Sequence, residues 1–386
     1  MRTVLVLFFS VVFLGFASGQ QVKRAKAVDG SPPMAVPADV HAKFLGGISL
    51  PPGFPLVAQQ NLPAYKAHAE EFAKTWQRFD AQYFSPMRAW SASELAPRIN
   101  RSKPVFYFFG GPDILSALAY YPTASDYILG GLEPVGILPA PETIESPELV
   151  SGLLALREAT NVVLQFGYFI TKDMKNQLAA SDFQGVVPVV LSFIALSGGE
   201  VMDVCYFAIR PDGSSVDFGA GPRPSPGTVP GVRITFRRQS GAAPQRVHYV
   251  QANVADGAVN PKRGVLAWTA KFGRGNAYLK AASYLLHEPS FGTIRSFLLR
   301  QSDSVLQDDS GMPLKFFQDG TWHCRFFGSY TGTLDIFKKY DQPSLRAAFL
   351  QSSIPLAFGT GYKWRTGESN LMLAVRQSPL RAEPAR

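Results

Sequence analysis

The stretch from Ser102 to Ile137 constrains the fold more than any other part of the chain. It begins with an uninterrupted apolar run at 105–109 (VFYFF), which suits a strand that is covered on both faces of a sheet. Gly110 and Gly111 then allow a sharp turn, since glycine tolerates a positive φ. A helical pattern and a second apolar run at 127–129 follow. A strand, helix and strand of this length predict two parallel strands joined by a right-handed crossover.

The turn at Gly110 and Gly111 also suggests a ligand site. A turn that leads from a strand into a helix exposes backbone N–H groups, which favour an anion. Glu133 follows about 20 positions later, where dinucleotide-binding folds place a carboxylate that binds ribose hydroxyls. We expect a small polar or anionic ligand at Gly110, Gly111, Asp113 and Glu133.

This unit resembles the opening unit of Rossmann-like methyltransferases and dehydrogenases, but the glycine pattern GxGxxG is absent. The same residues also fit a structural unit in which Asp113 caps the helix and Glu133 faces water.

The first 19 residues predict a secretory signal peptide. Arg2 precedes an apolar run at 4–16, and the small residues at 17–19 predict cleavage after Gly19. We therefore expect a secreted or periplasmic protein. Nicotinamide and adenosylmethionine cofactors are not normally supplied outside the cytoplasm, so the cofactor stays unassigned. The apolar run at 186–196 is too short to span a membrane and is expected to form a core helix.

The order of the apolar runs predicts an α/β fold with a Rossmann-like, mixed and mostly parallel sheet flanked by helices, an antiparallel hairpin and a C-terminal extension. An aromatic stripe at 63–84 predicts a long helix. Alternation at 232–236 predicts a strand that can pair with 245–254, and a hairpin is expected at 314–327. The expected divisions are a signal peptide (1–19), a flexible N-terminus (20–43), a Rossmann-like core (44–263), a C-terminal helical and β extension (264–376) and a disordered tail (377–386).

A polar helix face is the second candidate site. The candidate catalytic residues are Lys280, Ser283, Tyr284, His287, Asp308 and Asp309. The first four are spaced i, i+3, i+4 and i+7, so they would share one face of a helix expected at 275–287. The two aspartates follow in a turn, and the set offers the base, nucleophile and acids of a hydrolase or transferase. A solvated helix face beside an ordinary turn is the alternative.

Cysteine, histidine and charge patterns add less. Cys205 and Cys324 either form a disulfide or remain buried thiols. The five histidines have no metal-ligand spacing, so no metal site is assigned. The net charge of +9 comes from scattered residues, which indicates loose attraction to anionic envelope surfaces and not sequence-specific nucleic-acid binding. No transmembrane segment is expected after signal cleavage.

Five blocks are similar to those of an uncharacterised family of secreted bacterial proteins. The blocks are GGPDILSALAYYP, LEPVG, KAASYLLH, QDDSGMP and GSYTG, and the similarity extends from about Lys103 to Ala374. The resemblance implies a bacterial, extracytoplasmic protein without an assigned activity. Three functions remain open: a protein that binds a small ligand, a cell-envelope hydrolase or transferase, and a structural or partner-binding envelope protein.

Overall fold

The computed structural model describes residues 36–54, 56–139, 146–166, 183–219, 221, 223 and 225–377. The expected signal peptide, the N-terminus up to residue 35 and the C-terminal tail after Gln377 lie outside these residues. Within the described ranges, no helix combines the length and apolar character that a membrane crossing requires.

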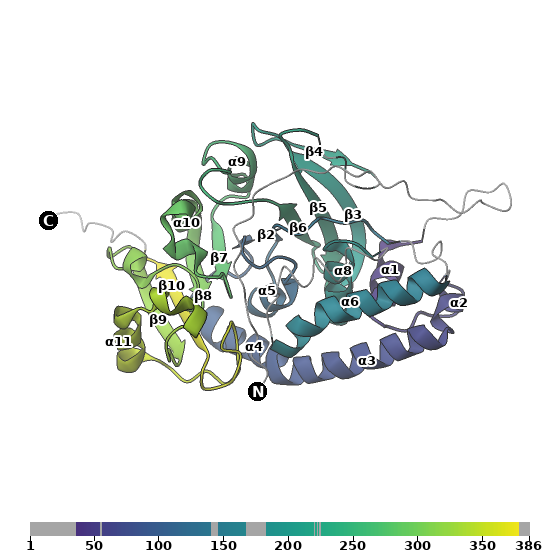
Figure 1. Cartoon of the computed structure of the whole chain (residues 1–386), viewed down its shortest axis with the longest axis horizontal. Coiled ribbons are helices and arrows are strands. Elements are labelled where there is room, and N and C mark those ends of the chain that lie inside the picture. Colours follow the sequence, from purple (N-terminus) through teal and green to yellow (C-terminus); the bar gives the residue numbers. More distant parts are fainter. Residues whose placement is uncertain are drawn as a thin grey trace.

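A single ten-stranded mixed sheet forms the centre of the molecule (Figure 1). Its strand order is β4-β3-β5-β6-β2-β1-β7-β8-β10-β9. The strands are β1 (Val105–Tyr107), β2 (Asp126–Gly131), β3 (Glu200–Ile209), β4 (Ser215–Phe218), β5 (Val229–Arg237), β6 (Gln245–Gln251), β7 (Gly275–Leu279), β8 (Ser302–Gln307), β9 (Trp322–Gly328) and β10 (Asn370–Arg376). The five central strands from β6 to β8 are parallel, and the strands on both sides of them pair antiparallel.

Helices cover both faces of the sheet. The α-helices are α1 (Ala38–Leu45), α2 (Val57–Gln60), α3 (Pro63–Phe79), α4 (Ser85–Trp90), α5 (Ile114–Tyr120), α6 (Ser146–Phe166), α8 (Val187–Leu196), α9 (Gly264–Ala270), α10 (Gly292–Gln301) and α11 (Pro343–Ser352). One buried apolar cluster joins α1, α3, α5, α6 and α8 to the first face, and a second joins α9, α10 and α11 to the other. The long helices α3 and α6 lie side by side (Figure 1).

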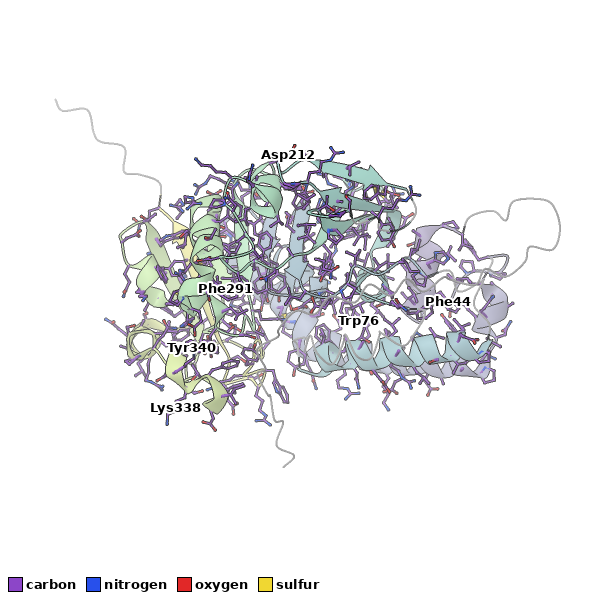
Figure 2. All side chains as sticks on the ribbon, turned by 45° about the horizontal axis from the view of Figure 1, so that its top comes forward. Phe44, Trp76, Asp212, Phe291, Lys338 and Tyr340 are labelled. Atoms are coloured by element: carbon purple, nitrogen blue, oxygen red, sulfur yellow. The ribbon has the colours of Figure 1, made fainter. Side chains whose placement is uncertain are left out.

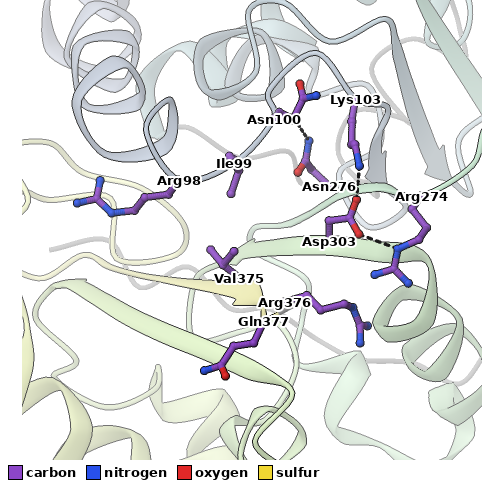
Figure 3. Close-up of a pocket in the computed structure, with 10 residues that line it drawn as sticks. All are labelled: Arg98, Ile99, Asn100, Lys103, Arg274, Asn276, Asp303, Val375, Arg376 and Gln377. Carbon is purple, nitrogen blue, oxygen red and sulfur yellow. Dashed lines mark hydrogen bonds and ion pairs between the residues drawn. The ribbon is translucent and has the colours of Figure 1, made fainter. Parts of the chain in front are cut away.

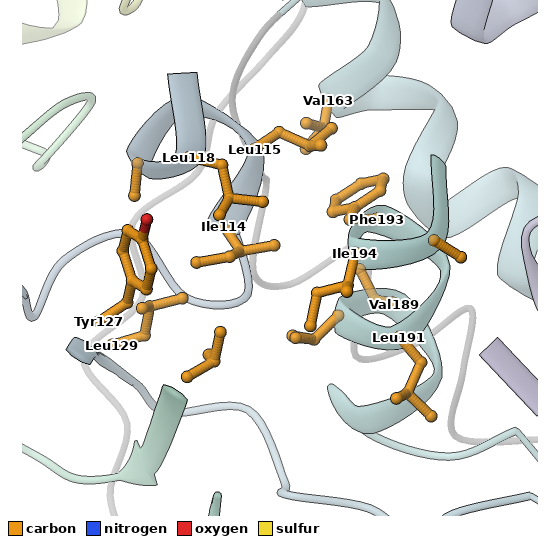
Figure 4. Close-up of a cluster of buried hydrophobic side chains, with 14 of the residues drawn as sticks. Ile114, Leu115, Leu118, Tyr127, Leu129, Val163, Val189, Leu191, Phe193 and Ile194 are labelled. Carbon is orange, nitrogen blue, oxygen red and sulfur yellow. The ribbon is translucent and has the colours of Figure 1, made fainter. Parts of the chain in front are cut away.

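The larger cluster explains why α5 and α8 are the innermost helices. Ile114 and Leu118 on α5 face Ile194 on α8 and Leu129 on β2, and all four side chains are buried (Figure 4). Burial of each such side chain contributes about 1.5–3 kcal/mol, so this packing fixes α5 against the parallel strands. The cluster extends to Phe44 on α1, far from the C-terminal segment that carries Tyr340 (Figure 2).

The parallel pairing of β1 with β2, with α5 between them in the chain, confirms the two parallel strands and the intervening helix expected within 102–137. The antiparallel pairing of β5 with β6 is confirmed as well. The expectation of a mostly parallel sheet is wrong, because four of the strand pairings are parallel and five are antiparallel. Both cysteines are free thiols.

Three local expectations are wrong. The expected helix at 275–287 is strand β7 followed by a turn, since all five residues of β7 are buried between β1 and β8. The expected hairpin at 314–327 is a 3-10 helix at Leu314–Phe317 followed by β9, whose partner in the sheet is β10. The N-terminus is ordered from α1 onward, because Val40 and Phe44 pack into the core.

Candidate functional site

The sequence-derived candidates gather at one edge of the sheet. Because β1, β2, β7 and β8 are parallel, their carboxyl ends share an edge, called the carboxyl edge below. Asp113, Glu133, Lys280 and Asp308 follow these strand ends in order. After β1 the chain continues to β2, its neighbour on one side in the sheet, whereas β7, its neighbour on the other side, continues away from it to β8. The carboxyl ends of β1 and β7 therefore flank a topological switch point. Open α/β sheets bind ligands at such points.

An internal ion pair occupies this switch point. The Lys280 ammonium contacts the Asp113 carboxylate and donates a hydrogen bond to Ser116 Oγ at 2.7 Å. Tyr107 donates to Asp113 Oδ2 at 2.9 Å, and Ser116 donates to the same carboxylate. The side chains of Lys280 and Asp113 are only 1% and 2% exposed. Burial and the adjacent Asp113 charge raise the pKa of Tyr107. The pair therefore joins β7 to the first strand–helix unit from within the core.

A pair of adjacent carboxyls, Asp308 and Asp309, follows the end of β8 at the same edge. Asp308 accepts hydrogen bonds from the Ala281 N–H at 2.9 Å and from the N–H and hydroxyl of Ser310. Burial, and then the neighbouring Asp309 charge, raises the pKa of Asp308 to about 7. Burial also raises the pKa of Asp309, which accepts hydrogen bonds from Tyr284 and from Asn370. Burial and Asp309 raise the pKa of Tyr284 as well.

The turn after β7 is conformationally unusual. Ala281, Ser283 and Tyr284 have φ of 50°, 52° and 54°, in the left-handed region that non-glycine residues seldom adopt. Each such residue costs of order 1–3 kcal/mol, so the surrounding bonds must hold the turn in place. Tyr362 supplies several of them: its hydroxyl contacts Ser283 Oγ at 2.8 Å and donates to the Ala281 carbonyl at 2.9 Å.

Glu133 is buried and does not face water. Its carboxylate accepts a hydrogen bond from Tyr249 at 3.0 Å, and its exposure is 2%. The glycines beside it leave the room that the carboxylate fills, since a Cβ at Gly111 would lie 3.1 Å from Oε1. The sequence pattern thus correctly predicted that an acidic residue lies near the end of β2, but it did not predict that this residue is buried.

The backbone N–H groups of the Gly110 turn are engaged within the fold. The Gly111 N–H donates to the Gly130 carbonyl at 3.2 Å, and the Asp113 N–H donates to the Gly110 carbonyl at 3.1 Å. The Asp113 side chain makes no capping bond to α5, because it binds Lys280 and Tyr107 instead. The turn therefore presents little donor capacity to an external anion.

His287 lies apart from the aspartates' side chains, in a 3-10 helix at Leu285–His287. Its ring packs edge-on against Tyr284 and Tyr340, each at 5.3 Å between centroids. Burial lowers the pKa of His287 to about 4, so its imidazole is neutral near pH 7. Ser283 and His287 make no hydrogen bond with one another among the bonds of the described residues, and the structure does not bring them together as nucleophile and base.

We expect the change Gly131→Ala to destabilise the protein by about 1–3 kcal/mol, which is typical of overpacking. The new Cβ would lie 2.8 Å from the Tyr249 hydroxyl and 3.1 Å from Gly111 Cα, and still closer to the Glu133 carboxylate. Chemical denaturation measures the effect. Gly257→Ala is the matched control, because nothing lies within 4 Å of its added Cβ. Equal stability of the two variants would contradict the tight packing of Glu133.

The opposite edge of the sheet carries an open cleft that the sequence did not reveal (Figure 3). Its volume is about 480 Å³, within the range of small-ligand sites. β1, β7 and β8 begin at this edge, and the antiparallel β10 ends there. The polar side chains that line the cleft are Arg98, Asn100, Lys103, Arg274, Asn276, Asp303, Arg376 and Gln377. We call it the amino-edge cleft.

Positive charge exceeds negative charge in the amino-edge cleft. Lys103 donates to Asp303 Oδ2 and Arg274 donates to Asp303 Oδ1, each at 2.6 Å (Figure 3). Arg98 is paired with Glu94. Arg376 instead donates its hydrogen bonds to the carbonyls of Leu299 and Ser302. Burial, and then repulsion from Arg274, lowers the pKa of Arg376. An added anion would relieve this repulsion.

Backbone contacts hold the two central guanidinium groups in position. Arg274 donates to the carbonyls of Arg300 and Ser302 at 3.1 and 3.0 Å. Arg376 lies over the Trp322 ring, 4.4 Å from its centroid. A guanidinium fixed in this way loses little freedom when it binds a carboxylate or phosphate.

The cleft was missed because its residues lie far apart in the sequence. Arg98 and Lys103 are close in sequence, but Arg274 and Arg376 lie far from them and from each other, and only the strand order brings the four together. The sequence contains only a weak signal for the cleft. Lys103 lies just before the strand expected to start at 105, and Arg376 lies just after the strand expected to end at 375.

Comparison with known proteins supplies no family: no family model, no curated protein and no solved structure matches the chain. The fold and its sites therefore define the protein only as an α/β protein with a ten-stranded mixed sheet. Within the described residues, no group of three or more His, Cys, Asp or Glu side chains could hold a metal ion.

Proposed function

We propose that the protein binds a small anionic molecule, one with phosphate or carboxylate groups, in the amino-edge cleft. The observation that carries this proposal is the convergence of Lys103, Arg274 and Arg376 around the single carboxylate of Asp303 in an open cleft of about 480 Å³. Arginine binds carboxylate and phosphate in a bidentate manner, and charge-assisted hydrogen bonds of this kind are strong.

The charge balance favours a multiply charged anion. Three cations face one carboxylate, since Glu94 already pairs with Arg98. Asn276 adds a polar wall, which its bonds to the Asn100 carbonyl and to Ser304 hold in place. A ligand that reaches both Arg274 and Arg376 would satisfy the remaining N–H groups of both.

The carboxyl edge supports this function less well. Asp113, Glu133, Lys280 and Asp308 are each at most 3% exposed, and they are bonded to one another, to neighbouring tyrosines and serines, or to the Ala281 backbone N–H. A hydrolase or transferase needs a reacting group that its substrate can reach. We therefore assign this network to holding the sheet together and the amino-edge cleft to ligand binding.

We also propose that the five parallel strands with α5 form a Rossmann-like core, and that the chain is an exported bacterial protein of the family its sequence blocks resemble. The parallel β1–α5–β2 unit supports the first proposal. Arg2 and the apolar run at 4–16 support the second.

We expect Arg376→Gln to weaken the binding of pyrophosphate or citrate by about 10–100-fold, the loss that corresponds to one charge-assisted hydrogen bond. Titration calorimetry of both anions at low ionic strength measures it, and added salt should weaken wild-type binding. Arg78→Gln is the control: it removes the same charge from an exposed position on α3. Equal weakening by both variants, or none by Arg376→Gln, would contradict a site in the cleft.

A further inference from the structure

Asp303 is the one carboxylate among the described residues that line the amino-edge cleft. Its side chain is 33% exposed, so a molecule in the cleft can reach it. Lys103 donates a hydrogen bond to Oδ2 and Arg274 donates one to Oδ1, each at 2.6 Å (Figure 3). A carboxylate offers about four acceptor positions, so these two bonds leave Asp303 able to accept another hydrogen bond from a ligand.

The stability of the fold gives little reason for a carboxylate at this place. The side chains of Lys103 and Arg274 are 40% and 44% exposed, and ion pairs with such exposed partners contribute little to the free energy of unfolding. Toward an anionic ligand Asp303 is repulsive, because it lies among the cations that attract the ligand. An anion without a hydrogen-bond donor would therefore bind better without Asp303, whereas an anion with a hydroxyl group can donate to it.

Two guanidinium groups converge beside Asp303. Arg274 Nη2 and Arg376 Nε both donate to the carbonyl of Ser302, at 3.0 and 3.2 Å, so one carboxylate or phosphate group can contact both side chains. A guanidinium has five N–H donors, and bonds within the described residues use three on Arg274 and two on Arg376. The remaining N–H groups form an anion subsite, and Arg274 connects this subsite directly to Asp303.

We propose that Asp303 makes the amino-edge cleft select anions that carry a hydroxyl group close to an anionic group. These are the hydroxy acids and the phosphates of sugars and polyols. The anionic group binds Arg274 and Arg376, and the hydroxyl donates to Asp303. This inference rests on the proposed function and narrows it, from small anions in general to hydroxylated ones.

Two pairs of anions test this selection, because the members of each pair differ only in hydroxyl groups. The pairs are citrate with tricarballylate, and glycerol 2-phosphate with isopropyl phosphate. Titration calorimetry of the full chain measures all four affinities at low ionic strength, without divalent cations, at a pH where every acid group of the ligands is ionised. In at least one pair, the hydroxylated member should bind about tenfold more tightly, the effect of one hydrogen bond to a charged acceptor.

Asp303→Ala should remove this preference, because the variant lacks the acceptor. It should also tighten the binding of the anion without a hydroxyl, because the repulsion is gone. Asp335→Ala is the matched control: it removes one carboxylate from an exposed position outside the cleft and should leave all four affinities unchanged. Thermal melting checks that both variants are folded, and the comparison within each pair on the wild type does not depend on any variant.

The possible results separate this inference from the proposed function. Equal affinity within both pairs would overturn the selection by Asp303 but leave the anion site in place. A preference that survives in a folded Asp303→Ala protein would also overturn it, because another residue would then recognise the hydroxyl. If no anion binds, pyrophosphate included, or if Arg376→Gln binds them as tightly as the wild type, the anion site fails and the selection fails with it.

Discussion

Replacing Lys280 by methionine is expected to lower the free energy of unfolding by about 3–5 kcal/mol, measured by chemical denaturation at neutral pH. The change leaves the Asp113 carboxylate buried without its cation, because only 2% of the Asp113 side chain is exposed to solvent. The Tyr107 and Ser116 hydroxyls remain, but neutral donors do not replace a charge in a buried site.

Two further variants separate the ion pair from general packing. Lys43→Met breaks a Lys–Asp pair on the surface of α1, whose side chains are 39% and 18% exposed, and should cost about 0–1 kcal/mol. Adding Asp113→Asn to Lys280→Met should restore much of the loss, because it removes the unpaired charge. A Lys280→Met protein no less stable than Lys43→Met would show that the pair does not hold the carboxyl edge together.

Asp308→Asn is expected to change how stability depends on pH. Since burial and Asp309 raise the pKa of Asp308 to about 7, the folded protein retains a proton that the unfolded chain releases near pH 4. This contribution is fully present below about pH 4 and is lost as the pH rises through 7. Between pH 5 and 8 the wild type should lose about 2–3 kcal/mol more unfolding free energy than the variant.

The comparison with the variant is essential because buried histidines act in the opposite direction. Burial lowers the pKa of His68 and of His287 to about 4, so each contributes stability that is present above about pH 6.5 and is lost as the pH falls toward 4. These contributions cancel when wild type and variant are subtracted. Asp212→Asn is the control: hydrogen bonds from Ser214 lower the pKa of Asp212, so it does not titrate between pH 5 and 8. Identical pH profiles for wild type and Asp308→Asn would contradict the assignment.

The first strand–helix–strand unit could be predicted from sequence because its signals are local. The run at 105–109, the two glycines and the second run at 127–129 lie within one stretch, and the structure confirms the parallel pairing. The segment 275–287 was misread because Leu279, Ala282 and Leu286 satisfy a helical spacing by coincidence. Burial on both faces of the sheet overrides that spacing, and Gly275–Leu279 becomes a strand.

The candidate catalytic residues lie near one another at the carboxyl edge, but not because they share a helix face, as predicted. Lys280 and Tyr284 reach the carboxyl edge through a strand end and a left-handed turn, not through a shared helix face. The amino-edge cleft could not be predicted, since it depends on β10 lying beside β8, from which it is well separated in the sequence. Such pairings follow from tertiary packing and leave no local pattern.

The most direct test of the account is a crystal structure of the full chain grown with the more tightly bound of pyrophosphate and citrate. We predict the anion in the amino-edge cleft, within hydrogen-bond distance of the Arg274 and Arg376 guanidinium groups, with the Lys280–Asp113 pair intact. An anion bound instead at the turn of Gly110 and Gly111, with Lys280 released from Asp113, would contradict the division of roles between the two edges.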